Sequence, residues 1–376
     1  MEPFRSGYYK QQYQYKSFLP TLLKEPFEWR SAAVLSLLEK ASAKLGELSS
    51  HSKHVPDINF FIGMHKTKEA ITSSRIEGTR TSIDEAVLDK KNVNPEKRDD
   101  WEEVQNYIKA LNYSLERIDD DFPLCMRLLR EAHGHLLSGV RGKDKLPGTI
   151  RTSQNWIGGA DIKSARFIPP HHEDLPELLS DLEHFWHDSE QQLPFLIRTA
   201  IVHYQFETIH PFLDGNGRIG RLLIMLQMMH HDLLDKPILY ISDFFEKNRS
   251  EYYDALMAAR TSNEMDHWLR FFLTGVIETA ESGKNTFTQI GELQTSYEKR
   301  ITMLGKRSKL ATQLLVKMYS SPIMSPRDVE AELQVTAATA NSLLRAMEKE
   351  DIITESTGRP RDRLYVLHGY LAIFRA

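Results

Sequence analysis

Residues 210–221, HPFLDGNGRIGR, lie between two stretches with helical periodicity, and this arrangement decides how the fold is read. The stretch before it presents one apolar helical face, formed by Leu196, Ile197, Ala200, Ile201 and Tyr204. Pro211 disfavours helical geometry at the residue before it, so we expect this helix to end at His210. A helical pattern then resumes in RIGRLLIMLQMM. The glycine-bracketed turn is therefore predicted at a helix N-terminus, where free backbone donors bind anions.

The side chains of this stretch are those that a polyphosphate requires. Asn216 offers a further donor, and Arg218 and Arg221, three residues apart on a helix, can grip separate phosphate oxygens. His210 can accept a proton from an incoming hydroxyl, and Asp214 has the oxygen chemistry that Mg²⁺ prefers. The alternative, a plain corner between helices with solvated arginines, accounts poorly for all these features together.

Two other nucleotide-binding motifs are excluded. Gly215, Gly217 and Gly220 spell GxGxxG, with Asp235 about twenty residues on, but a dinucleotide fold requires a strand before the glycines. A helix is predicted there instead. The sequence also contains no Walker A pattern, GxxxxGK[ST].

Composition bounds the class of protein. The chain has 376 residues, 41% hydrophobic and 27% charged, which predicts two or three domains. A formal net charge of -4 argues against a protein that coats nucleic acid over its whole surface. Cys125 is the only cysteine, which excludes an intramolecular disulfide and a thiolate zinc cluster. With no apolar run of membrane-spanning length, we expect a cytoplasmic protein without membrane contact. Paired histidines such as His133 and His135 are interpreted as solvated or core residues.

A mainly α fold is predicted, in three parts. Residues 1–100 are expected to form an N-terminal helical region, residues 101–305 the core, and residues 306–376 a winged-helix domain, because three helical patterns precede a strand, a basic turn and a strand. Residues 151–170 are expected to form a β-hairpin within the core. DNA and protein remain alternative partners of the winged helix. Its candidate contact residues are Thr336, Thr339, Asn341, Arg345, Arg359, Arg361 and Arg363.

HPFLDGNGRIGR resembles the signature of the Fic family, HPFx[DE]GNGRxxR, at every fixed position. KSFLPTLL, EKASAKLGEL and KEAITSSRIEGT are similar to the N-terminal part of one bacterial Fic subgroup. The resemblance implies a Fic-type helical core and a protein adenylyltransferase, which moves AMP from ATP to a hydroxyl of a target protein with pyrophosphate leaving. ATP is then the substrate and Mg²⁺ the cofactor.

The resemblance also implies roles for single residues. His210 would be the base, Asp214 the Mg²⁺ ligand, Arg218 the partner of the leaving pyrophosphate, and Arg221 the partner of the γ phosphate. The other implied ATP-binding residues are Gly215, Asn216 and Gly217 at the α and β phosphates, Ile219 and Gly220 in the same segment, and Tyr253 of NRSEYYDAL over the adenine.

Partners and rival functions stay open at this point. The hairpin over residues 151–170 would be a flap on which the target backbone docks by strand addition, and an ordinary surface hairpin is the alternative. The target, the modified residue type, self-modification and a homodimer are undecided. A DNA-binding regulator whose Fic core senses nucleotide is the rival function, and an intact His210 disfavours it because a sensor needs no base. Two arginines and a full motif favour AMP over phosphate or phosphocholine as the transferred group.

SSRIEG, residues 73–78, suggests a regulatory element. Ser73 and Glu77 share a helical face, and Gly78 is suited to the left-handed residue that ends a helix. A carboxylate there faces the negative end of its own helix dipole, which suggests an external cation, whereas a solvated charge is the alternative. The segment resembles the family's inhibitory motif, [ST]xxxE[GN]. This resemblance implies that Glu77 pairs with Arg221, that Ser73 helps to hold the carboxylate, and that basal activity is low.

Overall fold

The computed structural model describes residues 1–53, 58–139, 143–188 and 193–375. Its helices before the C-terminal part are α1 (Ala32–Ser52), α2 (Ile58–Ile76), α3 (Ile83–Ala86), α4 (Arg98–Asp119), α5 (Met126–Leu136), α6 (Leu175–His187), α7 (Phe195–Ile209), α8 (Asn216–His230), α9 (Ser242–Lys247), α10 (Arg249–Ser262) and α11 (Met265–Thr302). The predicted mainly α fold is confirmed.

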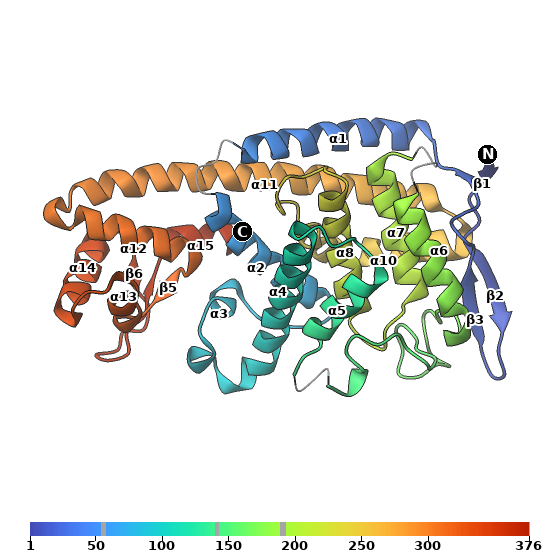
Figure 1. Cartoon of the computed structure of the whole chain (residues 1–376), viewed down its shortest axis with the longest axis horizontal. Coiled ribbons are helices and arrows are strands. Elements are labelled where there is room, and N and C mark those ends of the chain that lie inside the picture. The colour runs from blue at the N-terminus through green and yellow to red at the C-terminus, as the bar shows by residue number, and fades with distance from the viewer. Residues whose placement is uncertain (54–57, 140–142, 189–192, 376) are drawn as a thin grey trace.

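Helix α11 forms the spine of the molecule. It is 38 residues long, and α1 lies along it (Figure 1). Apolar side chains recur at helical spacing and face the core, among them Trp268, Phe272 and Val276, all fully buried. The indole Nε1 of Trp268 donates to the carbonyl of Ala200 on α7 at 2.8 Å. The spine is thereby joined to the helix that precedes the candidate site.

Helices α7 and α8 form the centre of the fold. Every residue from Leu196 to Ile209 on α7 is buried, as expected for a helix with neighbours on all sides. Helix α8 packs against α7, α4, α5 and α2. The turn that joins α7 to α8 therefore has a rigid foundation on both sides.

The N-terminal segment differs from the prediction, because residues 1–28 form strands and loops instead of helices. The strands are β1 (Glu2–Pro3), β2 (Gly7–Gln11), β3 (Lys16–Pro20) and β4 (Phe27–Glu28). Strands β2 and β3 pair antiparallel with Gly7 opposite Pro20, and a Cβ at Gly7 would lie 2.2 Å from the carbonyl oxygen of Leu19. Aromatic residues in GYYKQ and KSFLP suit a pleated strand, which explains the departure from helix.

The expected hairpin over residues 151–170 is present only in reduced form. A single antiparallel bridge joins Ile157 and Phe167, and the rest of the segment is irregular. The backbone N–H of Phe18 on β3 donates to the carbonyl of Ile168 at 2.9 Å, so the N-terminal hairpin adjoins this segment. The segment is held mainly by side chains such as Arg151 and Asn155, which turn inward and replace ladder hydrogen bonds.

The C-terminal part gathers at one end of α11 (Figure 1). It contains α12 (Ser308–Ser320), β5 (Ile323–Met324), α13 (Pro326–Leu333), α14 (Ala337–Lys349), β6 (Thr354–Glu355), β7 (Tyr365–Val366) and α15 (His368–Arg375), with its strands in the order β5-β7-β6. Strand β5 and helix α15 were not predicted. Phe374 on α15 packs edge-on against His65 on α2, with ring centroids 5.3 Å apart. The C-terminal part therefore contacts the helix that leads to Glu77.

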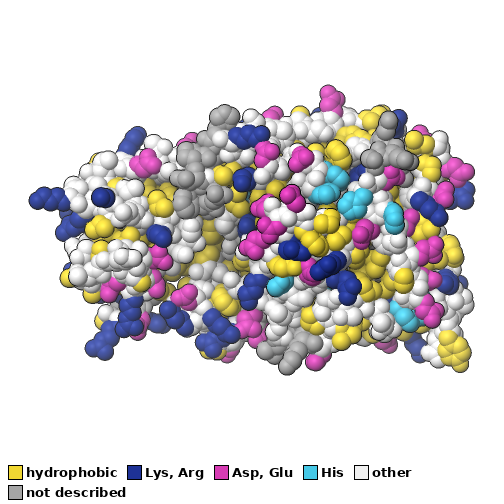
Figure 2. All heavy atoms as spheres, viewed as in Figure 1, with side chains coloured by type: hydrophobic (Ala, Val, Ile, Leu, Met, Phe, Trp, Pro, Cys, Tyr) yellow, Lys and Arg dark blue, Asp and Glu magenta, His cyan; other side chains and the backbone are white. Residues whose placement is uncertain are grey.

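Charges on the surface are mixed. On the face shown in Figure 2, acidic and basic side chains are interspersed, in keeping with the net charge of -4. Among the helices that the structure describes, none combines the length and the apolarity that crossing a membrane requires.

Trp268→Ala is expected to lower the free energy of unfolding by about 3 to 5 kcal/mol, because it opens a cavity beneath α7 and removes the bond to Ala200. Urea unfolding followed by circular dichroism measures the change. Trp156→Ala is the matched control, since Trp156 is 42% exposed, and its effect should stay within about 0.5 kcal/mol. Equal effects of the two substitutions would contradict the central position of α11.

Candidate active site

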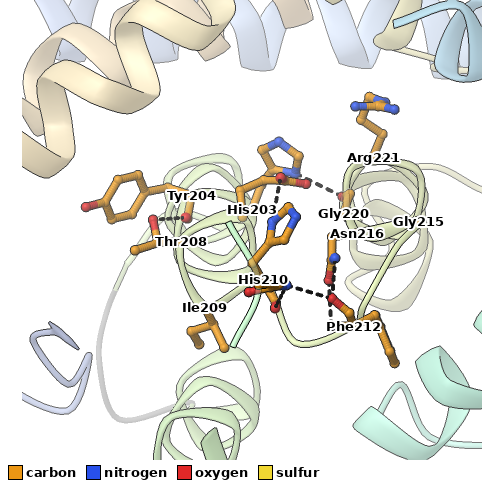
Figure 3. A network of polar contacts seen from close by, with 12 residues as sticks. His203, Tyr204, Thr208, Ile209, His210, Phe212, Gly215, Asn216, Gly220 and Arg221 are labelled. Carbon is orange, nitrogen blue, oxygen red and sulfur yellow. Dashed lines mark hydrogen bonds and ion pairs between the residues drawn. The ribbon is translucent and has the colours of Figure 1, made fainter. Parts of the chain in front are cut away.

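His210 occupies the turn between α7 and α8, where the sequence predicts the helix end (Figure 3). Its backbone is left-handed, with φ of 50°, which is uncommon for a residue with a side chain. Its carbonyl accepts hydrogen bonds from Nε of Arg151 at 2.9 Å and from Nδ2 of Asn155 at 3.2 Å. Arg151 also donates to the carbonyl of Ile209, so the end of α7 is capped by a buried guanidinium.

Asn216 closes the turn from the other side. Its Oδ1 accepts from the backbone N–H of Phe212 and its Nδ2 donates to the carbonyl of Phe212, both at 2.8 Å. The side chain is 2% exposed and both of its polar atoms are engaged within the turn. Asn216 therefore shapes the turn, and its predicted donation to a phosphate stays a prediction that would have to use the second N–H of Nδ2.

His133 on α5 is a part of the site that sequence reasoning missed. Its ring stacks on Phe212 with centroids 3.9 Å apart. Nδ1 accepts from the N–H of Gly148 at 2.8 Å, so Nε2 carries the proton and donates to the carbonyl of Asp214 at 2.9 Å. Burial lowers the pKa of His133 to about 4, which keeps the ring neutral in this role. Its spacing in the sequence carries no signal of this contact.

The first turn of α8 lacks intrahelical partners for its backbone N–H groups, as every helix N-terminus does. Gly215 precedes the helix with φ of 75°, and its N–H donates to Oδ1 of Asp214 at 2.6 Å. Arg218 lies at the same rim, with Nη1 3.3 Å from Oε2 of Glu103 and Nη2 3.7 Å from Oδ1 of Asp214. Asp214 keeps 47% of its side chain exposed. Arg218 and the N-terminus of α8, which can bind an anion, thus lie next to the carboxylate of Asp214, which can bind a cation.

Two residues of the predicted ATP-binding segment point elsewhere. The side chain of Ile219 is fully buried in the core. Gly220 faces Glu207 on α7, and a Cβ at Gly220 would lie 2.3 Å from Oε1 of that carboxylate. Both residues therefore face the core side of α8, and their predicted contact with ATP stays a prediction that the position of the Ile219 side chain does not support.

Glu77 follows the end of α2 and reaches the start of α8. Its Oε1 lies 2.7 Å from Nη2 of Arg221, and Ser73 accepts from the same guanidinium through Oγ at 2.9 Å and through its carbonyl at 2.8 Å. Gly78 has φ of 112°, so the helix ends as expected. A Cβ at Gly217 would lie 2.3 Å from Oε1 of Glu77. The carboxylate thus rests directly on the first turn of α8.

Charges of both signs shift the pKa values in the site. Burial opposes ionisation of Glu77, but the Arg221 guanidinium outweighs it and holds the pKa of Glu77 below its usual value. Burial, Arg260 and Arg151 lower the pKa of His210 to about 3, so the imidazole is neutral at neutral pH. A neutral imidazole can accept a proton, as a general base must.

Tyr253 lies on α10 near this centre. It is half-buried, and the guanidinium of Arg249 lies 5.9 Å from its ring centroid. The charges of Glu77 and Arg221 act on its hydroxyl, whose pKa is raised chiefly by burial. Its neighbour Tyr252 is buried, with its hydroxyl 2.9 Å from Nε2 of His203. Of the two tyrosines, Tyr253 alone retains surface for a ligand.

A cavity of about 400 Å³ adjoins the rim, and its lining includes Glu77, Asp214, Arg218, Glu103 on α4 and Leu136 on α5. The cavity therefore places space for a small molecule beside Arg218 and the exposed carboxylate of Asp214, at the turn that also carries the neutral His210 and precedes α8. This combination suits transfer of a phosphate-containing group to a hydroxyl.

Asn216→Ala is expected to lower the free energy of unfolding by about 1 to 3 kcal/mol, because it leaves buried backbone groups of Phe212 without partners. Thermal unfolding measures the loss. Asn92→Ala, at an exposed position, should change stability by less than about 0.5 kcal/mol. Unchanged stability with lost nucleotide binding would support the phosphate-binding role of Asn216.

Comparisons with known proteins agree with this geometry. Residues 35–116 match the Fic/DOC family N-terminal model, and residues 123–228 match the Fic/DOC family model. Protein adenylyltransferase fic-1 of Caenorhabditis elegans is 34% identical over 151 residues, which cover 40% of this chain and 26% of that protein. Protein adenylyltransferase Fic of Drosophila willistoni is 26% identical over 297 residues, which cover 78% of this chain and 52% of that protein. The chain thus spans about a quarter to a half of these relatives.

Solved structures share the fold. A Fic family protein from Desulfovibrio desulfuricans superimposes with a TM-score of 0.57 at 19% identity, covering 91% of this chain and 98% of that one. Fic-1 of Caenorhabditis elegans superimposes with a TM-score of 0.50 at 22% identity, covering 70% and 74%. With two adjoining family models matched on one chain and the motif residues His210–Arg221 in the turn between α7 and α8, the protein belongs to the Fic/DOC family.

Proposed function

We propose that this protein is an adenylyltransferase, which moves AMP from ATP to a hydroxyl side chain of a target protein and which is autoinhibited by Glu77. The observation that carries the proposal is a neutral His210 beside the free N-terminus of α8. The names of the relatives support the reaction class. A sensor of nucleotide would need the anion site but would have no use for the base.

The reaction assigns a task to each group at the rim. Backbone N–H groups at Asn216 and Gly217 hold the α and β phosphates, joined by that of Gly215 once it is released from Asp214, and Arg218 and Arg221 hold the β and γ phosphates. His210 takes the proton of the target hydroxyl as its oxygen attacks the α phosphorus. The bond from that phosphorus to the bridging oxygen breaks, pyrophosphate leaves, and the imidazolium returns its proton to water.

The residues fit a Mg²⁺ ion. Asp214 keeps 47% of its side chain exposed, and one exposed carboxylate together with phosphate oxygens and waters is how proteins commonly bind this ion. Asp214 would hold the ion, which would neutralise charge on the phosphates when bound. Two parts of the proposed site are left for the nucleoside. One is the cavity beside Asp214, and the other is Tyr253 on α10.

Autoinhibition follows from a competition for one cation. The carboxylate of Glu77 lies against Gly217 and pairs with Arg221, so a phosphate oxygen in its productive place would collide with it. Arg221 already donates to Ser73 and Glu77 through Nε and Nη2. The γ phosphate can engage Arg221 only when Glu77 withdraws.

The segment over residues 151–170 is the proposed docking edge for the target, by strand addition beside its single bridge. Self-modification belongs to the proposal because Tyr8, Tyr9 and Tyr13 expose their side chains on the hairpin that adjoins this segment. A cytoplasmic site of action accords with the single cysteine.

We further propose that residues 306–376 form a winged helix that contacts DNA or protein. Helices α12 to α14 followed by β6 and β7 support this assignment. Thr336 caps α14 and its hydroxyl lies 3.0 Å from that of Thr339, so both hydroxyls are engaged locally. Arg345, which is exposed, is the stronger candidate for contact on this helix.

His210→Ala is expected to lower the rate of AMP transfer by about 10² to 10⁴-fold, which is the usual cost of losing a general base. ATP affinity should stay within about twofold, since His210 makes no ground-state contact that the mechanism needs. Transfer is measured with ATP labelled on the α phosphate, and affinity by calorimetry. Transfer at the parent's rate would refute the mechanism.

Glu77→Gly is expected to raise initial AMP transfer about 5- to 150-fold, the range of a coupling of about 1 to 3 kcal/mol. Adding His210→Ala should cancel the gain. Glu25→Gly, at an exposed position away from the site, is the control and should leave the rate unchanged. Equal rates for the parent and Glu77→Gly at ATP concentrations well below KM, with Mg²⁺ present, would remove the autoinhibition, because a competition for Arg221 is most visible there.

A further inference from the structure

Glu207 on α7 is a buried carboxylate that the mechanism above does not use. It lies one turn before His210, is 6% exposed, and its Oε1 has no hydrogen-bond partner in the described residues. Its Oε2 lies 3.9 Å from Nδ1 of His210. Nδ1 is itself buried and forms no hydrogen bond of acceptable geometry in the described part of the chain. The carboxylate of Glu207 thus lies just beyond hydrogen-bond distance of the unpartnered Nδ1 of His210.

The absence of a side chain at Gly220 leaves space for the carboxylate of Glu207. A Cβ at Gly220 would lie 2.3 Å from Oε1 of Glu207, so glycine at this position of α8 leaves the room that the carboxylate occupies. The carbonyl of Gly220 lies 2.9 Å from Nδ1 of His203, which fixes the backbone at this point. A buried acid without a partner is costly, and a glycine that accommodates it points to a function.

The charges around the pair favour an interaction. Arg221 on α8 and Arg260 on α10 face Glu207, with Glu77 and the Tyr252 hydroxyl nearby. Arg151 and Arg260 face His210 and oppose its protonation. An imidazolium formed between two guanidiniums needs an anion. Once Glu77 has withdrawn, Glu207 is the protein carboxylate that the described structure places within 4 Å of His210.

We propose that Glu207 is the positioning residue of the base: its carboxylate accepts a hydrogen bond from Nδ1–H of His210, which leaves Nε2 as the basic nitrogen for the target hydroxyl. The inference rests on the proposed role of His210 as the base. During transfer the hydroxyl proton moves to Nε2, Nδ1 keeps its own proton, and Glu207 stabilises the positive ring without becoming protonated. A shift of about 1 Å brings the atoms into contact, and such bonds commonly tighten when substrate binds.

The ionisation of Glu207 gives the arrangement a pH signature. Burial raises the pKa of Glu207 to about 7, against the opposing effect of Arg221. The carboxylate is therefore neutral below this pH and charged above it, so kcat should rise as pH increases through about 7. The backbone carbonyl of Glu207 also acts as an acceptor for His210 and favours the charged imidazole. Because a carbonyl does not titrate, it contributes nothing to the pH dependence of kcat.

The test uses Glu207→Gln in the full chain carrying Glu77→Gly, so that transfer is measurable. We expect kcat to fall about 10²-fold or more, by analogy with the loss of the orienting carboxylate in a Ser-His-Asp triad. KM for ATP should change by less than about twofold. The rise of kcat with pH, which moves below 7 in this chain because Glu77 no longer raises the pKa of Glu207, should disappear. Glu292→Gln, at an exposed position on α11, is the matched control with unchanged kcat.

A second measurement needs no transfer activity. Nitrogen NMR of labelled histidine reports which ring nitrogen of His210 carries the proton, and we expect Nδ1–H in the parent and a changed tautomer or a shifted resonance in Glu207→Gln. Failure of the proposed function would appear as no transfer by Glu77→Gly, with this NMR result intact. An unchanged His210 spectrum, or kcat within about threefold with the pH dependence retained, would overturn the role of Glu207 and assign orientation to the backbone carbonyl.

Discussion

The turn between α7 and α8 depends on side chains that hydrogen-bond to backbone atoms. Arg151 and Asn155 bind the carbonyl of His210, Asn216 binds both backbone groups of Phe212, and His133 binds the carbonyl of Asp214. Each of these side chains is buried, and their separation along the sequence from the turn ranges from a few residues to about eighty. The left-handed conformation of His210 is sustained by these contacts, since strained backbone persists only where its surroundings determine it.

Arg221 links this turn to the rest of the molecule. The α2 helix that supplies its partners Ser73 and Glu77 is anchored through Glu69, whose carboxylate accepts hydrogen bonds from the hydroxyls of Tyr107 at 3.0 Å and Ser242 at 2.5 Å. The same helix carries His65, which packs against Phe374 of the C-terminal part. The C-terminal part therefore contacts the same helix that carries Ser73 and leads to Glu77.

Local signals in the sequence were sufficient for the helix end at His210, the helix start after Gly215 and the left-handed Gly78, because proline and glycine act on their immediate neighbours. They also placed Glu77 at a helix end in need of a cation. The contacts of Arg151 and His133 could not be predicted, since each joins segments far apart in the chain. Tertiary contact decides such roles, and a residue's type does not reveal its partner.

The partner of the Asn216 side chain could not be predicted for a different reason. Asn216 has the same donors whether they face a phosphate or the backbone of Phe212, and only the fold selects between them.

The buried charge of Arg221 needs a negatively charged partner. Arg221 is 2% exposed, and withdrawal of Glu77 without replacement would leave its charge buried and unpaired, which is costly. In the proposed autoinhibition, an anion that replaces Glu77 at Arg221 lowers this cost, and the phosphates of ATP are such an anion. Under that proposal, occupation of one buried cation couples binding of the nucleotide to release of Glu77.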